Sequence, residues 1–262
     1  MEGKKVVFFD IDGTIWDYTN YIPESTVRAI RALREKGNYA FICSGRCRSY
    51  IQAPSLFEIG FDGVVSGCGT MIEQGDKVVF YKELDTALVK RTIDTVRSFG
   101  MKPLLEGKDH LYMDYEEFKD DPYGKKLIGE MGKRIKGIRE SEGEWRCSKL
   151  SCETTASNID ECYEVLKEDY DFIIHTSSVV EMVPKGFSKA TGMKRITELL
   201  GCALEDTFAF GDGENDIEMI ETAGVGIAMG NGNDHVREVA DYVTAALEDD
   251  GIYKACEHFG LI

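Results

Sequence analysis

Short, continuously apolar runs recur in the first third of the chain, and each run ends in polar or small residues. The first run, Val6–Phe9, is typical of a strand that is buried on both faces of a parallel sheet. Two similar runs follow at Tyr39–Cys43 and Gly63–Val65. Between the first two, the apolar residues of Pro23–Lys36 recur at helical spacing, and Gly37 suits the helix end. This alternation of strands and helices predicts a doubly wound parallel sheet.

The pattern changes between about Leu84 and Pro184, where the chain is more polar and helices alternate with amphipathic strands. The segment Lys149–Thr154 alternates with a period of two, which indicates a strand with two different faces. We therefore expect an inserted α+β domain whose antiparallel sheet has one exposed face. Further elements expected here are helices at 86–98 and 159–167, a partly helical segment at 116–136, and strands at 103–105, 110–113, 172–174 and 179–183.

The first pattern resumes after Gly186. Ser188 suits the N-cap of a helix that continues to Leu200, and Gly201 suits its C-terminal end. Thr207–Phe210 is another buried strand. Further expected elements are a hairpin at 71–81 at the sheet edge, helices at 217–222, 234–240 and 248–259, and strands at 225–229 and 242–243. We predict an α/β protein with a doubly wound, Rossmann-like parallel-sheet core (residues 1–83 and 186–262) and an inserted α+β domain (residues 84–185).

Composition narrows the functional classes. The 262 residues suit one large domain or two smaller ones, and the net charge of −16 argues against nucleic acid and anionic membranes as partners. We find no apolar run of about 18 residues and no apolar leader, so we expect neither a membrane span nor a signal peptide. The eight cysteines form no Cys-x-x-Cys pair, so we expect reduced thiols and a cytoplasmic location. Nothing indicates an obligate protein partner.

Polar side chains follow three of the predicted parallel strands. The carboxyl ends of such strands lie side by side and form the usual ligand site of an open α/β sheet. Carboxylates two residues apart leave a strand on the same side, where they repel each other unless a cation or a proton intervenes. The residues that these strand ends bring together are Asp10, Asp12, Ser44, Asp212, Asn215 and Asp216.

Lys189 is the natural cation to complete this group. It lies in the first turn of a predicted helix, where the helix dipole disfavours a positive charge by roughly 0.3–1 kcal/mol and a carboxylate or bound anion would compensate. Lys185 is the alternative lysine. Four carboxylates in a small space favour a hard divalent cation with oxygen ligands, most commonly Mg²⁺. Asp-x-Asp-Gly is also a common turn and a fragment of calcium loops, but the full calcium pattern fails because no Asp or Asn follows at the next ligand position.

These residues form four segments that occur in the same order in a known family. The chain resembles the haloacid dehalogenase superfamily of phosphatases over nearly its whole length, and the insert resembles the α/β cap of the Cof-type branch. The segments that carry the resemblance are Asp10-Ile11-Asp12-Gly13-Thr14, Ser44-Gly45-Arg46, Lys189, and Gly211-Asp212-Gly213-Glu214-Asn215-Asp216.

The resemblance implies a role for each residue. Asp10 would attack phosphorus and form an aspartyl-phosphate, and Asp12 would act as general acid and then as general base. Phosphoryl oxygens would be held by Ile11 and Gly45 through their N–H groups, and by Ser44, Lys189 and Asn215. Mg²⁺ would be bound by Asp10, the Asp12 carbonyl and Asp212, with support from Asp216.

The sequence therefore predicts a Mg²⁺-dependent phosphatase for a small phosphate ester, either a sugar phosphate or a phosphorylated cofactor. The insert would act as a cap that excludes water and contacts the leaving group. One alternative is a phosphotransferase or phosphomutase of the same fold, which differs in whether water reaches the phosphorylated aspartate. The other is a phospho-accepting switch or a phosphate-binding module without turnover. A receiver-type switch would lack the second acid that Asp12 supplies, which favours turnover.

Overall fold

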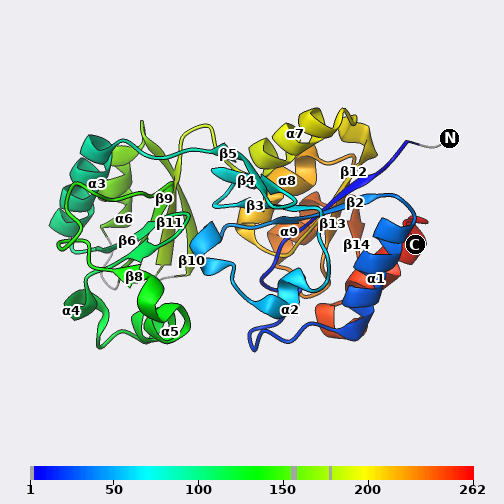
Figure 1. Ribbon diagram of the computed structural model, residues 1–262, viewed down its shortest axis with the longest axis horizontal. Helices are drawn as coiled ribbons and strands as arrows, with labels where there is room; N and C mark the ends of the chain where they lie inside the picture. The colour runs from blue at the N-terminus through cyan, green and yellow to red at the C-terminus, as the bar shows by residue number, and fades with distance from the viewer. Residues whose placement is uncertain (1–2, 155–157, 177–178) are drawn as a thin grey trace. The chain divides into compact units, whose positions relative to one another are not determined.

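The computed structural model describes residues 3–154, 158–176 and 179–262, and the chain divides into two compact units (Figure 1). The first unit comprises Met1–Gly45, Ala53–Phe80 and Phe187–Ile262, and the second comprises Arg46–Gln52 and Tyr81–Gly186. The predicted boundaries at residues 83/84 and 185/186 thus lie within a few residues of the changes between units. Residues 46–52, however, belong with the insert, because the Ser49 hydroxyl donates to the Gly107 carbonyl and Cys47 packs into an apolar cluster of the second unit.

The sheet of the first unit follows the predicted doubly wound pattern. In the described part of the chain it has eight strands in the order β14-β13-β12-β1-β2-β3-β4-β5. Strands β14 to β3 are parallel, and β4 is antiparallel to β3. The strands are β1 (Val6–Phe9), β2 (Tyr39–Cys43), β3 (Gly63–Ser66), β4 (Met71–Gln74), β5 (Lys77–Tyr81), β12 (Thr207–Gly211), β13 (Val225–Ala228) and β14 (Tyr242–Val243).

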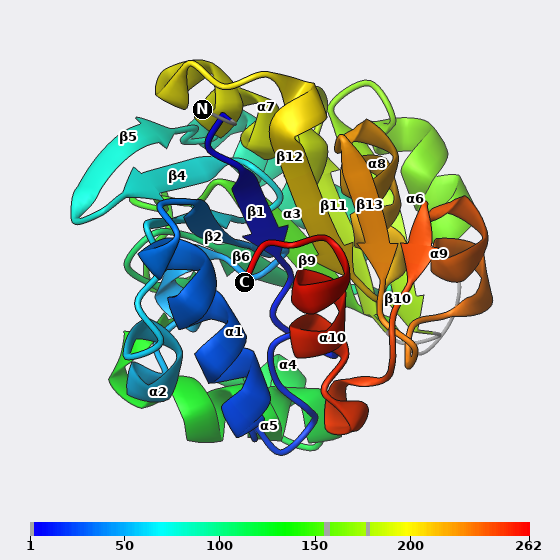
Figure 2. The ribbon, with the colours of Figure 1, turned by 90° about the vertical axis from the view of Figure 1, so that its right-hand side faces the viewer.

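Helices cover both faces of this sheet, as the continuously apolar strands require. Side chains alternate across β1, so Val6 and Phe8 face one way and pack with α7 and α8. Helices α1 and α10 lie side by side against the opposite face (Figure 2). The helices of this unit are α1 (Glu24–Glu35), α2 (Pro54–Phe57), α7 (Lys189–Leu200), α8 (Ile217–Thr222), α9 (Asp234–Val239) and α10 (Gly251–His258). The expected helix at 248–259 is divided, because Asp250 has φ 63° between a 3₁₀ turn and α10.

The second unit is the predicted α+β domain. Its described strands form a six-stranded sheet in the order β10-β11-β9-β6-β7-β8, in which only β7 and β8 pair in parallel. The strands are β6 (Lys102–Glu106), β7 (Leu111–Tyr112), β8 (Ile135–Lys136), β9 (Lys149–Glu153), β10 (Tyr170–Thr176) and β11 (Val179–Pro184). The helices are α3 (Thr86–Ser98), α4 (Tyr115–Phe118), α5 (Pro122–Met131) and α6 (Ile159–Leu166).

The expectation that one face of this sheet is exposed is wrong for its central strand. All five residues of β9 are buried. Helices α3 and α6 contribute to the apolar cluster on one face. On the other face, Leu104 packs with Phe118 of α4 and Leu127 of α5. The sequence predicts only a partly helical segment at 116–136, and the packing of α4 and α5 on β6 and β7 was not predicted.

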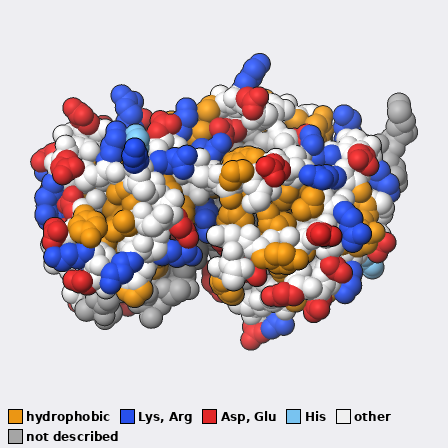
Figure 3. All heavy atoms as spheres, turned by 60° about the horizontal axis from the view of Figure 1, so that its bottom comes forward, with side chains coloured by type: hydrophobic (Ala, Val, Ile, Leu, Met, Phe, Trp, Pro, Cys, Tyr) orange, Lys and Arg blue, Asp and Glu red, His pale blue; other side chains and the backbone are white. Residues whose placement is uncertain are grey.

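Two surface properties bear on the expected partners. Among residues 3–154, 158–176 and 179–262, every helix is too short or too polar to cross a membrane. Lys and Arg side chains are interspersed with Asp and Glu over the face that Figure 3 shows. The charge of this acidic chain is therefore not separated into large regions of one sign on that face.

Candidate active site

Three of the predicted site segments begin where neighbouring parallel strands end. Asp10, Ser44 and Asp212 directly follow β1, β2 and β12. Strand β1 lies between the other two and pairs in parallel with both, so all three residues lie at the same edge of the sheet (Figure 2). The buried apolar strands thus place polar side chains from distant parts of the sequence next to each other.

Lys189 joins the first and last of these loops. Its side chain is fully buried, and its Nζ lies 2.6 Å from Asp10 Oδ1 and 2.6 Å from Asp216 Oδ1. The same Nζ donates to Asn215 Oδ1 over 3.2 Å. The predicted N-cap, Ser188, accepts a hydrogen bond from the Thr191 N–H in a capping box, which fixes the helix turn that carries Lys189.

The alternative lysine takes no part in this group. Lys185 is exposed, lies in the second unit and forms an ion pair with Asp171. Lys185 therefore contributes to the surface of the insert. Of the two candidates, Lys189 is the lysine that meets the acidic residues.

Carboxylates outnumber cations in this group. Oxygens of Asp10, Asp212 and Asp216 lie within 4.8 Å of one another. Burial raises the pKa of Asp10 well above its usual value, and the carboxylates around it act in the same direction against Lys189. Burial and Asp216 likewise raise the pKa of Asp212 to about 7. For Lys189, burial would lower the pKa, but the two contacting carboxylates outweigh it and raise that pKa well above its usual value.

This donor set fits a hard divalent metal ion. Such ions prefer carboxylate oxygens, and the excess negative charge is what a cation would neutralise. Both oxygens of Asp216 already have protein partners: Lys189 at Oδ1, and the N–H groups of Asp212 and Gly213 at Oδ2. Asp10 and Asp212 are therefore better suited to bind a metal directly, while Asp216 fixes the loop.

Two residues that were not among the predicted site residues hold the loops after β1 and β12 in place. The Thr14 hydroxyl donates to Asp212 Oδ1 over 2.9 Å, although Thr14 was noted only as part of the first segment. The Asn231 amide donates to the Gly13 carbonyl over 2.7 Å and accepts from the Leu247 N–H. Asn231 follows β13, the neighbour of β12, so its position after a fourth parallel strand was the available signal. Gly13 has φ +77°, and a Cβ there would lie 2.2 Å from Asp212 Oδ2, so the turn needs glycine.

Asp12 stands apart from the buried carboxylates. It is exposed, it is outside the group of three, and its Oδ1 accepts a hydrogen bond from the indole Nε1 of Trp16 over 3.0 Å. The contribution of its carbonyl to a metal site stays a prediction. Its side chain is nevertheless close enough to raise the pKa of Asp10 and of Asp212 through charge repulsion, which is the smallest contribution in each case.

The remaining predicted phosphate-binding residues lie in the same loops. Ile11, Ser44 and Gly45 are buried. Ser44 is held through its backbone, because its N–H donates to the Val65 carbonyl and its carbonyl accepts from the Cys68 N–H. The loop after β3 thereby supports the loop after β2. That these residues bind phosphate stays a prediction.

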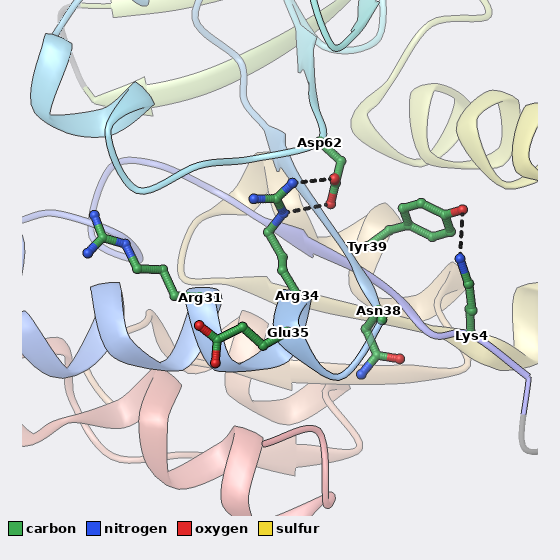
Figure 4. Close-up of a pocket in the computed structure, with 8 residues that line it drawn as sticks. Lys4, Arg31, Arg34, Glu35, Asn38, Tyr39 and Asp62 are labelled. Atoms are coloured by element: carbon green, nitrogen blue, oxygen red, sulfur yellow. Dashed lines mark hydrogen bonds and ion pairs between the residues drawn. The ribbon is translucent and has the colours of Figure 1, made fainter.

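A hollow lies near the amino ends of β1 and β2, away from this group (Figure 4). It has a volume of about 430 Å³, and its basic residues already have protein partners. Arg34 forms two hydrogen bonds with Asp62, and Arg31 donates to the Glu58 carbonyl. Lys4 lies over the Tyr39 ring. These contacts hold loops of the first unit together, so we assign the hollow a structural role.

Comparison with known proteins identifies the class to which this fold and this acidic site belong. The family model for haloacid dehalogenase-like hydrolases matches residues 7–256. The chain belongs to this family of enzymes, which confirms the predicted relationship.

Several known proteins are similar to this chain over nearly its full length. The chain is 32% identical to "Putative phosphatase YkrA" of Bacillus subtilis (strain 168) over 276 residues, covering 99% of each chain. It is 29% identical to 5-amino-6-(5-phospho-D-ribitylamino)uracil phosphatase YitU of the same organism, covering 100% of both. Among solved structures, the HAD subclass IIB sugar phosphatase BT4131 matches with a TM-score of 0.84 and 29% identity, over 99% of this chain and 100% of that one. The predicted fold class is therefore confirmed.

Proposed function

We propose that this protein is a Mg²⁺-dependent phosphatase that hydrolyses a small phosphate ester through an aspartyl-phosphate on Asp10. The observation that carries the proposal is the placement of Asp10. Its carboxylate lies at the end of a buried parallel strand, where it forms an ion pair with the fully buried Lys189 and lies close to the carboxyl oxygens of Asp212 and Asp216. A nucleophile at such a position is held in one orientation, which an in-line attack on phosphorus requires.

In the first step, an Asp10 carboxylate oxygen bonds to phosphorus as the bond to the leaving oxygen breaks. The leaving oxygen keeps the electron pair of the broken P–O bond and takes a proton from the Asp12 carboxyl group. In the second step, Asp12 takes a proton from water as the water oxygen bonds to phosphorus. The bond between phosphorus and the Asp10 oxygen breaks, and its electron pair returns to Asp10. Lys189, Ser44, Asn215 and the N–H groups of Ile11 and Gly45 hold the phosphoryl oxygens as charge shifts.

Asp10, Asp212 and the Asp12 carbonyl would hold the metal, with Asp216 in a supporting role. When bound, Mg²⁺ supplies positive charge that offsets the repulsion between an anionic nucleophile and an anionic substrate. The excess of carboxylates over cations around Lys189 supports this part of the proposal.

The names of the similar proteins favour a small substrate. BT4131 is described as a sugar phosphatase, and YitU as a phosphatase for a phosphorylated ribitylamino-uracil. We propose a sugar phosphate or a phosphorylated cofactor as the substrate class here. In this proposal, the unit that contains β1 carries the chemistry and the insert selects the substrate.

The test is phosphate release from p-nitrophenyl phosphate and from a panel of sugar and cofactor phosphates, with Mg²⁺ and with a chelator. We expect release that requires Mg²⁺, and a phosphoryl label on the protein that acid quenching traps and Asp10→Asn removes. A stable label without phosphate release would instead indicate a phospho-accepting switch. Transfer of the phosphoryl group to an added sugar phosphate in preference to water would indicate a mutase. No release and no label from folded, Mg²⁺-loaded protein would refute the proposal.

A further inference from the structure

The side chain of Trp16 contacts Asp12, the proposed general acid and base. Its indole Nε1 donates to Asp12 Oδ1 over 3.0 Å. Trp16 is only 2% exposed, whereas Asp12 is exposed. A buried, packed donor therefore holds one oxygen of a solvent-facing carboxylate.

The backbone fixes donor and acceptor relative to each other. The Gly13 N–H donates to the Trp16 carbonyl over 2.9 Å, and the Trp16 N–H donates to the Ile11 carbonyl over 3.1 Å. Asp12 and Trp16 also form an isolated bridge between the two arms of this turn. Backbone hydrogen bonds thus fix the main chain of Trp16, and burial restricts its side chain. The indole N–H therefore holds the Asp12 carboxylate in a defined position.

The indole N–H favours one of the two Asp12 oxygens over the other as the site of a proton. An indole N–H is a donor and never an acceptor, so the oxygen it contacts must accept. When Asp12 is protonated, its carbonyl oxygen is a better acceptor than its hydroxyl oxygen, so the contact at Oδ1 favours a proton on Oδ2. The hydrogen bond also limits rotation of a side chain that would otherwise sample several rotamers, at a cost in conformational entropy.

We propose that Trp16 is a positioning residue for both proton transfers by Asp12; this inference rests on the proposed phosphatase function. Trp16 holds Oδ1, so that Oδ2 gives its proton to the leaving oxygen in the first step and takes one from water in the second. Trp16 itself gains and loses no proton. The matched control is Trp145, the only other tryptophan in the sequence, whose indole donates over 2.8 Å to the Ile138 carbonyl in the second unit.

A spectroscopic test needs no catalytic activity. The ¹⁵N-labelled protein has two indole N–H signals, and Trp145→Phe assigns them. We expect Asp12→Ala, a change at an exposed position, to move the Trp16 signal and to leave the Trp145 signal in place. An unmoved Trp16 signal overturns the contact and with it the proposal, whether or not Trp16→Phe folds.

A kinetic test separates positioning from a general structural effect. An alkoxide needs a proton to leave, whereas p-nitrophenolate leaves without one. We expect Trp16→Phe to lower kcat/KM for glycerol phosphate by about ten- to hundredfold, and kcat/KM for p-nitrophenyl phosphate by less than about threefold. With p-nitrophenyl phosphate, kcat should still fall where hydrolysis of the phosphorylated Asp10 limits turnover, because that step uses Asp12 as base. Trp145→Phe should change both kcat/KM values by the same factor.

Two negative results have different meanings. If Trp16→Phe lowers kcat/KM for the alkyl and the aryl ester equally, Trp16 is structural and the inference fails, while the phosphatase proposal stands. If the wild-type protein hydrolyses neither ester with Mg²⁺ present, the proposed function itself fails.

Discussion

Among the residues that the structure describes, each unit buries a lysine between two carboxyl groups, and the two clusters differ in their place in the fold. In the first unit, Lys189 contacts Asp10 and Asp216, and its side chain is fully buried. In the second unit, Lys149 contacts Glu106 and Glu181, and its side chain is 3% exposed. In each cluster, two carboxyl groups contact one lysine.

The positions of these residues in their sheets separate the two clusters. Lys149, Glu106 and Glu181 lie within antiparallel strands, where Glu106 and Lys149 are directly opposite each other. Asp10 and Asp216 lie instead in the loops after parallel strands, beside Asp212, whose pKa is raised. Strand residues hold a sheet together, whereas loop residues at this edge are positioned for a ligand. A buried lysine thus indicates chemistry only in combination with its place in the fold.

The largest expected difference between the clusters comes from removing one carboxylate from each. Asp10→Asn should lower phosphate release by about 10⁴-fold or more, because an amide cannot serve as the nucleophile, while its oxygen can still accept from Lys189. Glu181→Gln, the matched change in the second cluster, should leave kcat for p-nitrophenyl phosphate within about threefold, a range typical of a residue outside the chemistry. Circular dichroism would verify that both variants fold. Full activity of Asp10→Asn would remove Asp10 from the mechanism.

Removing the lysines should give two different losses. Lys149→Met removes the cation that contacts two buried carboxylates, which should lower the free energy of unfolding by about 3–5 kcal/mol. We expect its kcat/KM for p-nitrophenyl phosphate, per folded molecule, to stay within about threefold. Lys189→Met should lower kcat/KM by about 10²- to 10³-fold, because a donor to the phosphoryl oxygens is lost.

Urea unfolding and phosphate release measure these two losses. Mg²⁺ should restore part of the stability of Lys189→Met, because a metal ion can neutralise Asp10 and Asp216. It should not restore the stability of Lys149→Met. If Lys149→Met lost as much activity as Lys189→Met at equal stability, the distinction between a structural and a chemical cluster would be wrong.

The same contrast explains how much the sequence alone could predict. The parallel strands are uniformly apolar and short, so the strands themselves and the polar residues that follow them, such as Asp10 and Asp212, could be predicted from the sequence. Hydrogen bonds and packing between remote residues were not. The apolar cluster over β6 and β7 depends on α4 and α5, whose segment is rich in charge, and residues 46–52 join the insert through Gly107, 58 positions from Ser49.

The other contacts that were not predicted depend on where folding places each side chain. Thr14 and Trp16 lie four or fewer residues from an aspartate, but the turn at Gly13 determines that their donors meet Asp212 and Asp12. Asn231 is linked to Gly13 across 218 positions. The buried cluster around Lys149 likewise depends on which strands become neighbours. A period-two pattern identifies the faces of one strand, but not the residues opposite each face.

The smallest expected effect concerns pH, and it separates the two clusters again. In the metal-free protein the pKa of Asp212 is raised to about 7, mainly by burial and by Asp216, so its carboxylate costs stability. The folded state then binds more protons than the unfolded state between about pH 4 and 7, and this group's contribution to stability falls as pH rises through that window. Because a metal needs the carboxylate form, the apparent affinity for Mg²⁺ should rise with pH by up to about tenfold per unit below pH 7, and should level off above it.

Thermal shifts at a series of Mg²⁺ concentrations from pH 5.5 to 8.5 measure this dependence. Thr14→Val removes the hydroxyl that donates to Asp212, a contact that favours its ionised form, so the rise should move to higher pH. Glu106→Gln, in the second cluster, should leave the curve where it is. A pH-independent affinity would mean that Asp212 gives up no proton on binding and that the metal lies elsewhere. A curve that moved with Glu106→Gln but not with Thr14→Val would place the metal-linked proton in the insert.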